Sequence, residues 1–74
     1  MEKQLIKLKA KIQGITANME YRSRKIHGIV CSRADFDTIE MYIDTYLRQG
    51  NINGFMQPNG NVKEVFDKAN IYFN

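Results

Sequence analysis

Two hydrophobic periodicities overlap in the first 21 residues of the chain, and the fold depends on which of them is realised. At helical spacing, apolar residues recur every three or four positions at Leu5, Leu8, Ile12, Ile15 and Met19. At a spacing of two, apolar residues from Ile6 to Ile12 alternate with lysines, and the alternation resumes from Ile15 to Tyr21. The first pattern predicts one amphipathic helix, and the second predicts two strands.

The register of the possible strands favours a hairpin. If Gln13 and Gly14 form a two-residue turn, Ile12 faces Ile15 and every apolar side chain of the two strands lies on one face. A continuous helix would carry Gly14 in its interior, which costs about 1 kcal/mol relative to alanine. However, Lys, Gln, Glu, Leu and Ala are better helix formers than strand formers, so the helical alternative stays open.

We therefore predict an α+β fold with a three-stranded antiparallel meander at about residues 4–12, 15–22 and 26–31, with residues 22–25 as a polar loop. The alternative is an all-α fold with a coiled-coil-like helix at the N-terminus. Three short strands followed by a helix, over residues 4–49, resemble the small DNA-binding domains at the N-termini of phage-type tyrosine recombinases. The resemblance is one of architecture, without a shared sequence motif.

Two helices are predicted to cover the sheet. Ser32 begins a capping-box-like sequence, and Gly50 ends a helix over residues 33–49. A shorter helix over residues 62–69 follows, with Asn61 as its N-cap.

The chain ends in an apolar tail, Ile71-Tyr72-Phe73, that is costly to leave in water. We expect it to dock on the same chain as a final strand, and the alternative is a contact in a homodimer. With 74 residues and no linker or repeat, residues 1–74 are expected to form a single small domain.

Charge is distributed unevenly along the chain. Up to Arg33 there are eight Lys and Arg residues against two Glu, and beyond it there are three against six acidic residues. A clustered positive field attracts polyanions, so the N-terminal half is expected to bind something acidic.

Nucleic acid is the first candidate partner, because alternate residues of a strand would project their lysines from one face. The residues expected to contact phosphates are Lys7, Lys9, Lys11, Arg22, Arg24 and Lys25. The residues expected to lie near base edges are Thr16, Asn18 and His27.

The alternative function is a protein-interaction module, such as an inhibitor or adaptor of the kind that phages and other mobile elements encode. It would use an acidic ridge on the long helix together with aromatic residues and the apolar tail. These residues are Asp37, Glu40, Asp44, Tyr42, Tyr46, Ile71, Tyr72 and Phe73. Binding through the apolar groups should depend little on salt, whereas phosphate-driven binding should weaken steeply.

No catalytic signature is present, so a non-enzymatic protein without cofactors is expected. On the predicted third strand, His27 and Cys31 would lie about 13 Å apart, too far for a shared metal ion or a Cys-His nucleophile. The single cysteine and the absence of a long apolar stretch favour a cytoplasmic protein that does not enter the membrane.

Overall fold

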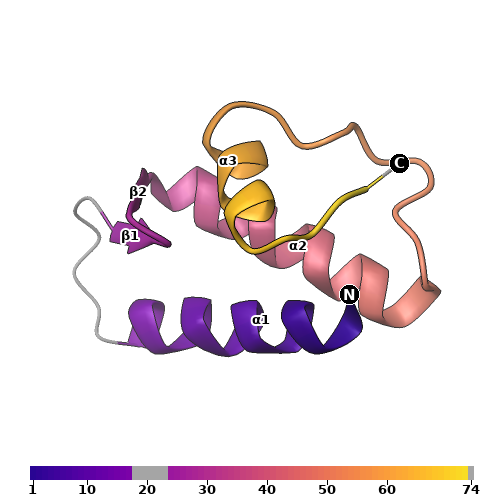
Figure 1. Cartoon of the computed structure of the whole chain (residues 1–74), viewed down its shortest axis with the longest axis horizontal. Helices are drawn as coiled ribbons and strands as arrows, with labels where there is room; N and C mark the ends of the chain where they lie inside the picture. Colours follow the sequence, from indigo (N-terminus) through magenta and orange to yellow (C-terminus); the bar gives the residue numbers. More distant parts are fainter. Residues whose placement is uncertain (18–23, 74) are drawn as a thin grey trace.

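The N-terminal segment is a helix. The structure is a computed structural model that describes residues 1–17 and 24–73. Its first element is α1 (Glu2–Ala17), so the strands predicted at residues 4–12 and from residue 15 are wrong over the described residues (Figure 1). Gln13 and Gly14 lie inside this helix.

Burial against a second helix explains why the helical pattern prevails. Leu5, Leu8 and Ile12 of α1 are buried, and Ile15 packs against the same core, as the spacing of three and four residues requires. The penalty for Gly14 is small beside the burial of three large aliphatic side chains, each of which contributes about 1.5–3 kcal/mol. The alternative prediction of an N-terminal helix is therefore confirmed, although the fold is α+β and not all-α.

A β-hairpin follows, at a different place from the predicted strands. Strand β1 (Arg24–Ile26) pairs antiparallel with β2 (Ile29–Cys31), and Ile26 faces Ile29 across the turn. The turn residues His27 and Gly28 both have positive φ, at 52° and 81°, which matches the twist of a tight hairpin. Residues 24 and 25, predicted as loop, are thus strand residues. The sheet has two strands in the described part of the chain, so the resemblance to recombinase domains loses its basis.

The long helix was predicted correctly. Helix α2 (Arg33–Gln49) begins with a capping box: the backbone N–H of Asp35 donates to Ser32 Oγ at 3.1 Å, and the N–H of Ser32 donates to the Asp35 carboxylate at 3.3 Å. It ends at Gly50, which adopts the left-handed conformation.

The last helix starts earlier than predicted. Helix α3 (Gly60–Lys68) has Asn59 at its N-cap without a side-chain cap bond, so the prediction that Asn61 caps it is wrong. Asn61 Nδ2 instead donates to the backbone oxygen of Val30 at 3.0 Å. This bond links α3 to the hairpin.

The described residues share one hydrophobic core between α1, the hairpin, α2 and α3. Helices α1 and α2 lie against each other, and α3 packs on α2, which it crosses in the view of Figure 1. The tail docks on the same chain as expected, but as irregular structure: Ile71 is buried, and its N–H donates to Phe66 O at 2.8 Å.

Candidate functional site

The predicted lysine strip is divided by the helix. Lys7 and Lys11 are exposed on α1, whereas Lys9 is partly buried and forms an ion pair with Asp44 of α2. Residues two apart on a helix differ by about 200° in direction, so these three lysines cannot form one strip. The strip of Lys7, Lys9 and Lys11 is a wrong prediction.

A different row of lysines does lie along α1. Lys3, Lys7 and Lys11 are spaced four residues apart, which places them on neighbouring positions of one helix face, about 6 Å apart along the axis. All three are exposed, and none has an ion pair with a described residue. Lys3 was not among the predicted contact residues. The signal for it was a lysine at every fourth position, which becomes visible once residues 2–17 are read as a helix.

The lysine row ends near the hairpin turn. The pKa of the partly buried His27 is lowered by desolvation and by the positive charges of Lys11 and Lys68. Lys11 of α1 and Lys68 at the end of α3 thus each act on the imidazole of the turn. Lys68 was not predicted as a site residue, because its proximity to His27 arises from tertiary packing.

The other predicted nucleic-acid contacts are dispersed. Lys25 is exposed on β1, and Arg24 is partly buried, with its Nε and one terminal nitrogen lacking a hydrogen-bond partner among the described residues. Thr16 uses its hydroxyl within α1, where it donates to the backbone oxygens of Ile12 and Gln13 at 3.1 Å. Asn18 and Arg22 lie outside the described residues.

The predicted acidic ridge on α2 is largely compensated within the chain. Asp44 pairs with Lys9, and Asp37 pairs with Arg33 one turn earlier, with an N–O distance of 3.5 Å. Glu40, which lies between Asp37 and Asp44 in the sequence, is partly buried. A ridge with two of its three charges paired offers little free negative field to a partner.

Two of the predicted partner-binding aromatics belong to the core. Tyr42 is buried, and burial raises the pKa of its hydroxyl. Its ring stacks on that of Phe73 with centroids 6.0 Å apart, and Tyr46 contacts Phe73 at 5.8 Å. These rings stabilise the tail and are not available as a flat docking surface.

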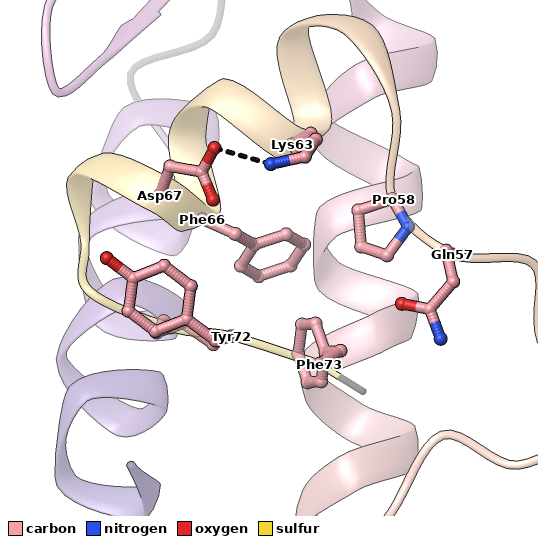
Figure 2. A pocket seen from close by; sticks show the side chains of 8 residues that line it. Gln57, Pro58, Lys63, Phe66, Asp67, Tyr72 and Phe73 are labelled. Carbon is pink, nitrogen blue, oxygen red and sulfur yellow. Dashed lines mark hydrogen bonds and ion pairs between the residues drawn. The ribbon is translucent and has the colours of Figure 1, made fainter.

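Tyr72 is the tail residue that points outward, with 62% of its surface exposed. It borders a mostly apolar pocket of about 490 Å³, where the rings of Phe66 and Phe73 also lie (Figure 2). Lys63 forms an ion pair with Asp67 at 2.8 Å on the edge of this pocket, and that hydrogen bond raises the pKa of Lys63. The full lining is Gln57, Pro58, Lys63, Phe66, Asp67, Ile71, Tyr72 and Phe73.

Cys31 is a buried side chain of β2. Its thiol donates to the backbone oxygen of Ile29 at 3.5 Å, and desolvation, with a smaller contribution from the charge of Asp35, raises its pKa. A raised pKa disfavours the thiolate that metal binding or nucleophilic attack requires. No group of three metal-ligating side chains occurs within residues 1–17 and 24–73.

No helix in the described part of the chain has the length and apolar character needed to span a membrane. Comparison of the chain with models of protein families, with curated proteins and with solved structures gave no match.

Proposed function

We propose that this protein is a small, non-enzymatic binding protein that contacts the phosphate backbone of nucleic acid. The contact surface is the lysine row of α1, defined as Lys3, Lys7 and Lys11, continued by His27 and Lys68. The observation that carries the proposal is that these lysines are exposed and have no ion pair among the described residues, whereas Lys9, Arg33 and Lys63 are paired with acids.

The geometry of the row suits a polyanion. Three ammonium groups extend over about 12 Å of helix length, and each can reach a separate phosphate, because one nucleic-acid strand carries a charge about every 3.4 Å along the duplex axis. Asp44 and Asp37 of α2 are paired with Lys9 and Arg33, so these two carboxylates weaken the field of the row less than free carboxylates would. Such contacts attract nucleic acid without reading its sequence.

The test compares two triple variants of equal charge. Lys3, Lys7 and Lys11 are replaced by Ala in one variant, and Arg33, Arg48 and Lys63 in the other, so both reduce the formal net charge from +3 to zero. Binding to a short mixed-sequence DNA duplex is measured by fluorescence anisotropy at several salt concentrations. For the intact chain, the slope of log affinity against log salt concentration should be about −2.7 or steeper, because each of three phosphate contacts contributes about −0.9.

The row variant should lose affinity and most of this slope, and the matched variant should keep the slope. Equal losses in the two variants would mean that net charge, and not the lysine row, governs binding. Failure of the intact chain to bind at low salt would overturn the proposal.

A second candidate is self-association through the tail. Tyr72, which is 62% exposed, lines this pocket, and Met56, which is 78% exposed, lines a neighbouring pocket that shares Gln57 and Pro58 with it, so both give accessible apolar groups. This interaction would persist at high salt and would weaken in Tyr72→Ser. Sedimentation equilibrium checks it: a monomer at all concentrations excludes a homodimer of this kind.

A further inference from the structure

Three aromatic rings line the pocket between α3 and the tail. Phe66 lies in the last turn of α3, and Tyr72 and Phe73 belong to the tail (Figure 2). The rings of Phe66 and Phe73 are nearly perpendicular, with an interplanar angle of 89° and centroids 5.0 Å apart. Figure 2 shows Pro58, from the loop before α3, on the opposite side of the pocket from Tyr72. Segments from three parts of the chain therefore enclose one space.

Most of the wall is held in place by the core. Phe66 and Ile71 are buried, and the N–H of Ile71 donates to the backbone oxygen of Phe66 at 2.8 Å. The ring of Phe73 also contacts those of Tyr42 and Tyr46. Walls that are already ordered lose little conformational freedom when a ligand binds. The volume of about 490 Å³ lies in the range of small-molecule sites, about 300–1,000 Å³.

The electrostatics of the pocket favour a cation. The faces of aromatic rings carry negative partial charge. The carboxylate of Asp67 also lines the pocket, and it lies in the last turn of α3, where the helix dipole favours a positive charge. One oxygen of Asp67 accepts a hydrogen bond from Lys63 at 2.8 Å, and the other accepts none from a residue that the structure describes. This second oxygen can face a bound cation.

Lys63 is the opposing charge. Among the described residues that line the pocket, it carries the only positive charge, and its side chain is 61% exposed. The four-carbon stem of lysine is flexible, so the ammonium can turn into water when another cation approaches Asp67. Lys63 thus competes with a cationic ligand, whereas it would assist an anionic one. The sign of its effect on affinity distinguishes the two classes of ligand.

We infer that this pocket binds a small quaternary ammonium compound of the choline class, with its methyl groups against the rings of Phe66, Tyr72 and Phe73 and its charge beside Asp67. A quaternary ammonium group has no N–H to donate, so ring faces and a carboxylate can hold it without further hydrogen-bond acceptors. The inference goes beyond the proposed binding of nucleic acid and does not depend on it, because no residue of the lysine row lines the pocket.

The test compares choline with dimethylbutanol, its neutral isostere in which carbon replaces the nitrogen. Both are titrated into the intact chain at constant ionic strength, and affinities are obtained from the NMR shifts of amide and ring protons. The two ligands bury similar apolar area, so a difference in affinity reports the charge. We expect choline to bind about fivefold more tightly or better. Its methyl protons should show nuclear Overhauser effects to the rings of Tyr72 and Phe73.

Substitutions of the charged groups test the sign of the ligand. Asp67→Asn should weaken the binding of choline severalfold and leave dimethylbutanol nearly unchanged. Glu64→Gln is the matched control, because Glu64 is an exposed carboxylate of the same helix that does not line the pocket. Lys63→Gln should tighten the binding of choline, since it removes the competing ammonium. Amide spectra confirm that each variant is folded.

Substitution of Tyr72 tests the rings. Tyr72→Leu keeps an apolar side chain without a ring face, so it should weaken choline more than dimethylbutanol. Phe55→Leu is the matched control, because Phe55 is also an exposed aromatic residue and does not line this pocket. It should leave both affinities unchanged.

Each of the other outcomes overturns the site. Equal or tighter binding of dimethylbutanol would show an apolar pocket without preference for a cation. Weaker binding of choline by Lys63→Gln would show that the pocket favours an anion. Shifts of the ring protons that depend on protein concentration without ligand would show that a second copy of the chain occupies the pocket. Absence of choline binding would also overturn the inference, and none of these results would affect the proposal for the lysine row.

Discussion

Lys9 of α1 and Asp44 of α2 form an ion pair across 35 positions of sequence. The contact joins the two longest helices beside their buried apolar faces. It also takes one residue from the predicted basic strip and one from the predicted acidic ridge. The basic strip and the acidic ridge were predicted to bind different partners, but at this contact a charge of one neutralises a charge of the other.

A double-mutant cycle measures this contact. Lys9→Ala and Asp44→Ala should each destabilise the fold by about 0.5–1 kcal/mol, with a coupling free energy of about 0.5 kcal/mol, as is typical of partly exposed pairs. Urea unfolding at low and high salt provides the values. Additive effects of the two substitutions would show that the pair contributes nothing to stability.

Gly14 distinguishes the helix from the predicted hairpin. In α1 it is exposed, and a Cβ atom there would meet nothing within 4 Å, so Gly14→Ala should stabilise the protein by about 0.5–1 kcal/mol. A hairpin turn with positive φ at this position would instead be destabilised by alanine. Urea unfolding decides, and Gly50→Ala serves as the contrast: Gly50 has a φ of 75°, so alanine should destabilise there by about 1 kcal/mol.

The error at the N-terminus has a physical origin. The alternation of apolar residues with lysines was compatible with a strand, but a strand buries its apolar face only if a partner layer fits it. In α1, Leu5 and Leu8 meet α2, and that contact depends on a helix more than twenty residues away in the sequence. Helix α2 was predictable because its signals are local: Ser32 and Gly50 mark its two ends.

The candidate site, too, was predictable from local sequence patterns only in part, because its remaining features depend on tertiary packing. Lysines spaced four apart were visible in the sequence, but they define a face only after the helix is known. The proximity of Lys68 to His27 depends on how α3 packs against the hairpin, which no local pattern encodes. Likewise Lys9 was expected to face solvent, and its pairing with Asp44 required the tertiary structure.

The tail offers a matched pair of adjacent aromatic residues. Phe73 contacts Phe66 edge-to-face at 5.0 Å and stacks on Tyr42, so Phe73→Ala should destabilise the fold by about 1–3 kcal/mol. Tyr72 points outward, and Tyr72→Ala should change stability by no more than about 0.5 kcal/mol. Thermal unfolding compares the two. Equal effects would contradict the docked position of the tail.

Cys31 should be chemically inert in the folded protein. It is 1% exposed and its pKa is raised, so the reactive thiolate is both scarce and inaccessible. A disulfide reagent at pH 8 should modify it slowly without denaturant, and the rate should rise in urea in parallel with unfolding. Because the pKa of Cys31 is raised in the fold, its neutral thiol contributes to the stability of the protein. This contribution is complete below the pKa of the unfolded chain and is lost as the pH rises through the folded-state pKa. Rapid modification in native buffer would indicate that β2 opens readily.

The folded protein should lose stability in mild acid through His27. Its pKa in the fold lies below the ordinary value of 6.5, so the unfolded chain takes up a proton first as the pH falls. The contribution of the neutral imidazole to the free energy of unfolding is complete above pH 6.5, and it is lost progressively as the pH falls through the folded-state pKa. Urea unfolding at a series of pH values from 7.5 to 5.5, in buffer without phosphate, measures this loss.

His27→Asn supplies the control for that series. Asparagine adopts positive φ readily and suits the first position of this hairpin turn, so the variant should fold at least as stably as the parent. It cannot titrate in this range, and its unfolding free energy should therefore fall less between pH 7 and 5.5. The carboxylates contribute equally to both proteins, so the difference between the two curves isolates His27. Parallel curves would contradict the lowered pKa of His27 in the folded protein.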